Sequence, residues 1–239
     1  MAATVTVLVH SPLTGPAAWG ELPSVLRGRG HEVAVVDVPD DDRPPYAARF
    51  VARAALQLRD AVGASPIVLA GHSGAGYLLP LIGAARRAAR AAVAGYLFVD
   101  AGLPPTRPTS RLQLMRAEDP AFAEPLEAQL RAGVAFPDWS DDDLKDLVPD
   151  DAARGALVSS LRPRDSDFFL EDLPVAPDWP DAPCGYLRLS PSYDRAARSA
   201  RQRGWPVVDG PDTRPGGHFA AVAEPATVAD DLARLLAHL

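Results

Sequence analysis

Residues 71–76, with the sequence GHSGAG, have the types and spacing of a serine nucleophile on a tight turn. They follow a strand-forming run, residues 67–70 (IVLA), and precede a segment with helical character. A serine between a strand and a helix needs small neighbours, because larger side chains collide in the turn. The pattern Gly-X-Ser-X-Gly is met with Ala75 in place of the last glycine, a mild departure. Because the segment has neither the lysine of a phosphate loop nor a dinucleotide fingerprint, we predict Ser73 as a nucleophile.

A candidate base lies near the end of the chain, in residues 216–219 (GGHF). A serine hydroxyl becomes a good nucleophile when a base removes its proton, and an acid must orient that base. His218 follows the last predicted strand, precedes the last predicted helix and is flanked by glycines, which suits a loop at the carboxyl edge of a sheet. We therefore predict His218 as the general base.

The elements that must position these groups alternate along the chain. Short, nearly continuous apolar runs are typical of strands buried on both faces of a parallel sheet. They occur at residues 5–9, 33–36, 67–70, 96–99, 186–189 and 206–208. Helical patterns lie between and after them, at residues 19–29, 46–62, 74–90 and 225–239. This order predicts an α/β fold, a doubly wound and mostly parallel sheet of about six strands.

The alternation stops between residues 101 and 182, which show helix signals and no convincing strand. Such a segment is far longer than an ordinary connection between a strand and a helix. We predict that residues 1–100 and 183–239 form the core and that residues 101–182 form an inserted helical cap. The acidic residues within residues 138–151 are interpreted as a solvated face with carboxylates at helix N-termini, and no metal site is predicted.

These motifs, in this order, resemble the alpha/beta-hydrolase superfamily over essentially the whole chain. The resemblance rests on residues 7–10 (VLVH) with Trp19, on residues 71–76, and on residues 217–219 (GHF) followed by Glu224 and Pro225. It implies a serine-nucleophile enzyme in which the first strand here matches the third strand of the family. It also implies that a cap inserted after Asp100 shapes substrate access.

Two aspartates are candidates for the acid that orients His218, because both keep the order Ser, Asp, His. The family usually places this acid after the penultimate strand, which would select Asp194. Ser190 and Pro191, however, indicate an N-cap and the first residue of a helix, where an acid is common for dipole reasons alone. Asp100 ends the preceding strand, a position that some family members use. We favour Asp100, keep Asp194 as the alternative, and leave Asp209, Asp212 or no acid as the remaining interpretations.

The oxyanion site departs from the family pattern. Gly74, directly after the nucleophile, is expected to offer its N–H. The second donor of the family follows a His-Gly pair, but here Pro12 stands at that position and has no N–H. We expect that Leu13 supplies the second N–H through a shift of register; otherwise one donor is lost. A lost donor would favour chemistry that does not need an oxyanion hole with two donors.

Four further side chains are candidates for the substrate pocket: His10, His72, Trp139 and Phe168. His72 is better explained by packing beside the nucleophile than by catalysis. His10 is better explained as a residue that shapes the entrance loop. Trp139 and Phe168 would line an acyl pocket or pack within the cap.

Composition excludes several classes of function. The net charge of −7 argues against a nucleic-acid binder, and no apolar stretch approaches the length of a membrane span. A single cysteine, Cys184, fits a reducing compartment, and residues 1–15 show no secretory signal. The abundant Ala, Pro and Arg suggest a GC-rich, bacterial genome. We expect a cytoplasmic enzyme with a small-molecule substrate and no metal or organic cofactor, and the sequence leaves a homodimer open.

The favoured hypothesis is a serine hydrolase that acts on an ester, lactone or thioester through an acyl-enzyme. One alternative keeps the fold and uses His218 as the general base of a lyase, a cyclase or an acyltransferase. Another is a ligand-binding receptor on a hydrolase fold, which the intact pair of Ser73 and His218 disfavours.

Overall fold

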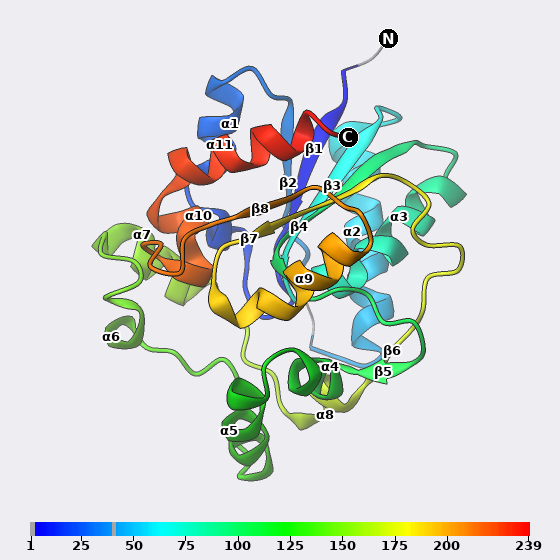
Figure 1. Ribbon diagram of the computed structural model, residues 1–239. Coiled ribbons are helices and arrows are strands. Elements are labelled where there is room, and N and C mark those ends of the chain that lie inside the picture. Colours follow the sequence, from blue (N-terminus) through cyan, green and yellow to red (C-terminus); the bar gives the residue numbers. More distant parts are fainter. Residues whose placement is uncertain (1–2, 40–41) are drawn as a thin grey trace.

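The computed structural model describes residues 3–39 and 42–239 and is built around a parallel sheet of six strands (Figure 1). The strand order is β2-β1-β3-β4-β7-β8. The strands are β1 (Val5–Val9), β2 (Val33–Val36), β3 (Ile67–Ser73), β4 (Val93–Ala101), β7 (Cys184–Arg188) and β8 (Val207–Asp209). All five neighbouring pairs are parallel, so the carboxyl ends of β3 and β4 meet at one edge.

Helices cover both faces of this sheet, which confirms the predicted doubly wound α/β class. Side chains of α2 (Tyr46–Val62), α3 (Leu79–Ala88) and α9 (Asp194–Gln202) pack in the apolar cluster on one face. Those of α1 (Leu22–Gly28) and α11 (Pro225–Leu236) pack in the cluster on the other face. In β1, Val7 and Val9 pack in the first cluster and Leu8 packs in the second, so both faces of this strand are buried.

Short helical turns connect these elements at the edge where the strands end. They are the 3-10 turns η1 (Pro16–Trp19), η2 (Gly76–Leu78), η3 (Pro191–Tyr193) and η4 (Gly217–Phe219), and the short helix α10 (Ala220–Ala223). The helix predicted over residues 74–90 is therefore divided, and its regular part begins only at Leu79, next to Pro80. Proline is favoured in the first turn of a helix, where its missing N–H has no helical partner.

The segment between β4 and β7 is mainly helical, and Figure 1 shows its helices gathered near one end of the sheet. Its helices are α4 (Arg111–Glu118), α5 (Pro120–Arg131), α6 (Asp141–Leu144), α7 (Asp151–Ser159) and α8 (Ser166–Leu170). The expectation that this segment has no strand is wrong in one respect, because β5 (Thr109–Ser110) pairs antiparallel with β6 (Asp172–Leu173). Strands of two residues are too short to give a period in the sequence. That residues 101–182 form a distinct cap stays a prediction.

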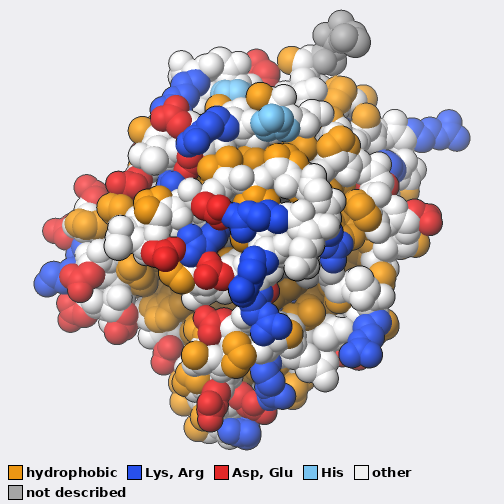
Figure 2. Space-filling view, viewed as in Figure 1, with side chains coloured by type: hydrophobic (Ala, Val, Ile, Leu, Met, Phe, Trp, Pro, Cys, Tyr) orange, Lys and Arg blue, Asp and Glu red, His pale blue; other side chains and the backbone are white. Residues whose placement is uncertain are grey.

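The acidic residues of this segment lie on the surface. Asp141, Asp142 and Asp143 are exposed in the first turn of α6, and acidic side chains gather on the side of α6 and α7 (Figure 2). Carboxylates are favourable at the N-terminus of a helix. Within residues 3–39 and 42–239, no helix has both the length and the apolar character to cross a membrane.

Candidate active site

Ser73 is the last residue of β3 and has the strained backbone of a nucleophile on a sharp turn. Its φ angle is +56°, a left-handed value that is uncommon for a residue other than glycine. The pairing of β3 with β4 shifts register between His72 and Ser73, so the chain leaves the sheet at this point. The turn exposes the Ser73 side chain at the carboxyl edge of the sheet.

The small residues around Ser73 are needed to different degrees. A Cβ at Gly76 would lie 2.2 Å from the carbonyl oxygen of Gly102, and a Cβ at Gly71 would lie 2.9 Å from the Leu79 side chain. The turn therefore requires these two glycines for its close approach to β4 and α3. Ala75 is fully buried and its methyl group fits within the apolar core. The departure from Gly-X-Ser-X-Gly is thus accommodated by the packing.

His218 lies in η4, and two glycines with positive φ bring the chain to it. The φ angles are +78° at Gly216 and +46° at Gly217, and a Cβ at Gly216 would lie 2.6 Å from the Cβ of Ala223. Only glycine tolerates both conditions. The imidazole is partly exposed, and its Nδ1 lies 2.8 Å from Oδ2 of Asp100.

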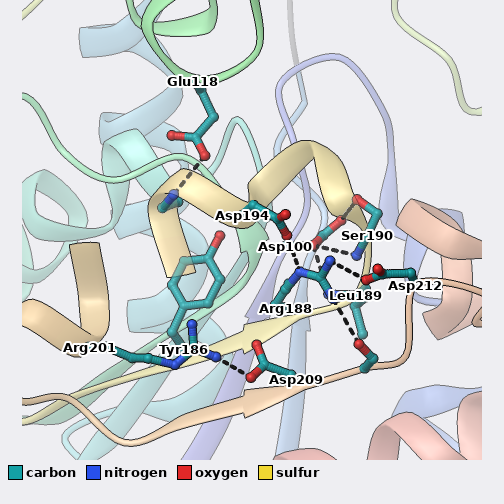
Figure 3. Close-up of polar contacts among 12 residues, drawn as sticks. Asp100, Glu118, Tyr186, Arg188, Leu189, Ser190, Asp194, Arg201, Asp209 and Asp212 are labelled. Atoms are coloured by element: carbon teal, nitrogen blue, oxygen red, sulfur yellow. Dashed lines mark hydrogen bonds and ion pairs between the residues drawn. The ribbon is translucent and has the colours of Figure 1, made fainter. Parts of the chain in front are cut away.

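Asp100 is fully buried next to the end of β4 and accepts four hydrogen bonds. Figure 3 shows those from Leu189 and Ser190. Its Oδ1 accepts from the N–H groups of Leu189 (2.7 Å) and Ser190 (3.0 Å). Its Oδ2 accepts from the Ser190 hydroxyl at 2.6 Å, besides the contact with His218. A buried carboxylate needs such partners, and these hold its oxygens in place toward the imidazole.

The alternative acids have other partners. Asp194 and Asp212 both accept from the Arg188 guanidinium, and Asp209 pairs with Arg201 (Figure 3). The side chain of Asp194 is 51% exposed, whereas that of Asp100 is 0% exposed. The structure thus brings Asp100 to His218 and leaves Asp194 in an ion pair at the start of α9.

His72 contacts the imidazole of His218 from one side. The two rings stack with centroids 4.4 Å apart, and the His72 Nε2–H donates to the His218 carbonyl oxygen at 2.9 Å. Burial, and then the nearby His218, lower the pKa of His72 to about 3. This neutral imidazole therefore supports the position of His218 without adding a positive charge beside it.

In the entrance loop after β1, Ser11 lies beside the turn that carries the nucleophile. The Leu13 N–H, expected from the sequence as an oxyanion donor, donates to Oγ of Ser11 at 3.2 Å. The Ser11 hydroxyl also faces the residue after the nucleophile, since a Cβ at Gly74 would lie 3.3 Å from it. Ser11 is almost fully buried, yet it lines the same cavity as Ser73.

His10 anchors this loop and is not among the residues that line the cavity. Its Nδ1–H donates to the Ser11 carbonyl oxygen at 2.7 Å, and its Nε2 accepts from the Val38 N–H at 3.1 Å. Burial lowers the pKa of His10 to about 4, so the ring stays neutral at pH 7 and makes both hydrogen bonds at once.

A cavity of about 590 Å³ lies over Ser73 and His218. Most of its remaining wall is apolar and comes from the entrance loop, the turns η2 and η4, and the helical segment, with Leu13, Tyr77, Met115, Phe122, Phe136, Trp139, Leu144, Leu147 and Phe219. Three carboxylates also line it, those of Glu118, Asp119 and Asp143, whereas no lysine or arginine does among the described lining residues. Such a wall suits an uncharged, largely apolar molecule.

The two aromatic residues proposed for the pocket lie in different places. Trp139 lines the cavity and contacts Phe136 and Phe219 edge to face. Phe168 is buried in the core of the helical segment, beneath the Arg111 guanidinium at 4.0 Å, and is not among the lining residues.

Sequence reasoning missed three residues that contact this centre. Ser190 was interpreted as an N-cap, but its hydroxyl bonds to Asp100 and makes no capping bond. No sequence motif marks Ser11 or Tyr193 as part of this centre. The Tyr193 hydroxyl lies 3.4 Å from Oγ of Ser73, while no hydrogen bond joins Ser73 to His218 among the described contacts. Each of these contacts joins distant parts of the chain or depends on loop geometry, so no local pattern signals it.

Comparisons with known proteins agree on the fold. A sequence model of the alpha/beta hydrolase family matches residues 6–231, and no curated protein matches the chain. An extracellular alpha/beta-hydrolase from a Paenibacillus species is similar in structure, with a TM-score of 0.73, 18% identity, and coverage of 97% of this chain and 98% of that chain.

Two further solved structures show that this fold serves different reactions. Tomato methylketone synthase I gives a TM-score of 0.70 at 13% identity and covers 100% of this chain and 99% of its own. A pyrethroid hydrolase from Sphingobium faniae gives 0.66 at 17% identity, with coverage of 97% and 96%. At such identities the likeness shows the shared fold. Together with the family match, it supports an enzyme.

Proposed function

Because the chain belongs to the alpha/beta hydrolase family, we propose that it is a serine hydrolase that cleaves an ester, thioester or lactone of a small apolar acid through an acyl-enzyme. One observation carries this proposal. His218, bonded through Nδ1 to the buried Asp100, lines the same cavity as Ser73 on its strained turn. An alcohol, an imidazole and a carboxylate are the three groups of a catalytic triad, which supports this assignment.

In the first half of the reaction, Oγ of Ser73 bonds to the acyl carbon and its proton passes to Nε2 of His218. Asp100 holds the Nδ1–H and stabilises the imidazolium that forms. The leaving alcohol or thiol takes the proton from Nε2 as its bond to the acyl carbon breaks. Catalytic hydrogen bonds are often loose without substrate, and we expect that between Ser73 and His218 to form in the complex.

In the second half, His218 removes a proton from water, which attacks the acyl carbon of the intermediate. The acid product leaves as the bond to Ser73 breaks, and the proton returns from His218 to Oγ. The reaction consumes one water and needs no redox partner.

The oxyanion formed in both halves needs hydrogen-bond donors in front of Ser73. We assign the Gly74 N–H as one donor and the Ser11 hydroxyl as the second. Because Oγ of Ser11 already accepts from the Leu13 N–H, its own proton is available to another acceptor. The hydroxyl would thus replace the backbone donor that Pro12 removes.

The reaction can be tested with a fluorophosphonate probe and p-nitrophenyl esters of short acids. We expect one adduct per chain, located on Ser73 by peptide mass spectrometry, and ester hydrolysis that Ser73→Ala abolishes. Ser24→Ala, on the exposed face of α1, is the matched control and should retain full activity. Absence of both the adduct and hydrolysis in the unmodified protein would overturn the proposal.

The second candidate is a non-hydrolytic reaction with His218 as the general base. It is favoured by Pro12, which removes one backbone donor from the usual oxyanion site. Retained probe labelling without turnover of any ester, thioester or lactone, together with a substrate-dependent reaction lost in His218→Gln, would favour this candidate.

A further inference from the structure

Tyr193 contacts both reacting side chains of the site. It ends η3, which follows β7 after two residues, and its hydroxyl lies 3.4 Å from Oγ of Ser73. Its ring stacks on the imidazole of His218 with centroids 5.3 Å apart and planes 13° apart. Tyr193 also lines the cavity, so its hydroxyl stands where substrate and nucleophile meet.

The contact with His218 completes a stack of three rings. His72 and Tyr193 both stack on the His218 imidazole, with interplanar angles of 28° and 13°. These contacts restrict rotation of the imidazole about its side-chain bonds, while Asp100 restrains it within the plane. The ring of Tyr193 therefore has a positioning role that its hydroxyl does not share.

Arg188 links the loop of Tyr193 to the loop of His218 (Figure 3). Its guanidinium donates to Asp194, the residue after Tyr193, and to Asp212 and the Gly210 carbonyl oxygen, which precede His218. A guanidinium forms several such bonds at once in a fixed geometry. This restrains Tyr193 and His218 relative to each other.

We propose that Tyr193 is a further catalytic residue of the hydrolase proposed above, whose phenolic O–H donates a hydrogen bond to Oγ of Ser73 whenever that oxygen carries negative charge. This occurs as the Ser73 proton passes to His218 during attack. It occurs again when Oγ leaves the acyl group, before His218 returns the proton. Tyr193 keeps its own proton throughout, so no other group has to accept it.

The surroundings of the phenol suit this role. Burial of its hydroxyl, and then the nearby Tyr77 and Asp100, raise the pKa of Tyr193 well above its usual range. The phenol is therefore a neutral donor at neutral pH. A hydrogen bond to a charged oxygen is stronger than one between neutral groups, so its effect is greatest in the charged states of the reaction.

Two substitutions separate the hydroxyl from the ring. Tyr193→Phe retains the stack on His218 and removes one oxygen atom, whereas Tyr193→Leu removes both. The matched control is Tyr46→Phe, which removes the same atom from a tyrosine that packs against Phe168, outside the cavity. Each variant is compared by its thermal midpoint, its rate of phosphonylation at Ser73, and its burst and steady-state rates on a p-nitrophenyl ester across pH.

We expect Tyr193→Phe to lower phosphonylation, burst rate and kcat by roughly 10- to 100-fold, the usual effect of a lost bond to a charged oxygen. KM, the pH midpoint and the thermal midpoint should stay near those of the unmodified protein. Tyr193→Leu should in addition shift the pH midpoint, and Tyr46→Phe should change none of these values.

Rates within twofold of the unmodified protein in Tyr193→Phe would overturn the role of the hydroxyl. The role of the hydroxyl would also be overturned by an equal loss of rate in Tyr46→Phe. A loss of rate in Tyr193→Phe that a lower thermal midpoint explains would overturn it as well. These outcomes leave the proposed function intact, since Ser73 still reacts. An unmodified protein that neither reacts with the probe nor hydrolyses an ester would instead refute the proposed function, and the role of Tyr193 with it.

Discussion

Asp100 and Asp194 differ in everything that decides whether a carboxylate can orient a histidine. Asp100 is buried and shares its oxygens among two backbone N–H groups, the Ser190 hydroxyl and His218. Asp194 is half-exposed and holds Arg188. At the residue scale, the proposed mechanism therefore depends on Asp100.

We predict that Asp100→Asn lowers kcat by on the order of 10³- to 10⁴-fold, because the amide favours the wrong tautomer of His218. Asp194→Asn retains the cavity and every contact of Asp100, so it should lower kcat less than tenfold. Steady-state kinetics on one ester, with circular dichroism to check folding, compares the two. The reverse order of effects would identify Asp194 as the acid.

Ser11 gives a second prediction at this scale. Ser11→Ala should lower kcat by about 10²- to 10³-fold with little change in KM, as expected for the loss of one oxyanion donor. Ser11→Thr keeps the hydroxyl and should retain more activity than Ser11→Ala. If both variants lose the same activity, or neither loses any, the hydroxyl is not the second donor.

The buried histidines predict how stability depends on pH. Burial lowers the pKa of His10 to about 4 and of His72 to about 3, from an ordinary value of 6.5. Between pH 6.5 and 4 the unfolded chain therefore binds more protons than the folded one. The contribution of these two neutral histidines to the free energy of unfolding is fully present above pH 6.5 and decreases as the pH falls.

Thermal midpoints measured from pH 7 to pH 4 should show this decrease. His10→Gln should be less stable at pH 7 and show a smaller decrease, whereas His238→Gln, at an exposed position near the C-terminus, should behave like the unmodified protein. An unchanged pH slope in His10→Gln would show that other groups cause the acid sensitivity.

At the scale of elements, the site forms where β3, β4 and β7 end side by side. β3 carries Ser73, β4 carries Asp100, and the turn after β7 supplies the donors from Leu189 and Ser190. Parallel strands bring these ends to one edge, where sites of α/β proteins are built. The close approach of η2 to β4 is part of this arrangement, and it depends on Gly76.

Two glycine substitutions should have opposite effects on stability. Gly76→Ala places a Cβ 2.2 Å from a backbone oxygen and should cost about 1–3 kcal/mol of unfolding free energy, with loss of activity. Gly155→Ala, inside α7 and with open space around its Cβ, should add about 0.5–1 kcal/mol. Urea unfolding measures both. Equal effects would show that backbone entropy, not the contact with β4, decides the outcome at Gly76.

The whole molecule has a net charge of −7, and its cavity contains carboxylates and no lysine or arginine among the described lining residues. Figure 2 shows acidic side chains over α6 and α7, and Asp143 of α6 lines the cavity. Both the surface field and the cavity wall therefore disfavour an anion.

We predict that a neutral ester is hydrolysed with a kcat/KM at least about tenfold higher than a matched ester whose acid part carries a second, free carboxylate. The difference in kcat/KM between the two esters should become smaller at high salt, because ions screen the electrostatic field of the protein over about 3 Å at 1 M. Hydrolysis of such matched esters at low and high salt tests this. A preference for the anion would contradict the proposed substrate class.

Much of the fold and part of the candidate site could be predicted from the sequence, because their causes are local. Continuous apolar runs predict buried parallel strands, and the α/β class that they indicate is confirmed. The family resemblance, which rests on motifs such as residues 71–76, is confirmed by the family match. The tight turn at Ser73 and the loop at His218 require small residues beside them in the chain, and these appear as residues 71–76 and 216–219.

Only the tertiary structure decided which groups meet at these turns. Asp100 contacts residues about 90 and 118 positions away, and Tyr193 contacts Ser73 from 120 positions away. Such contacts depend on how strands align and how loops end, which no short pattern records. The same three-dimensional packing determines three further contacts. They are the ion pair of Asp194 with Arg188, the hydrogen bond from the Leu13 N–H to Ser11, and the stacking of Tyr193 on His218.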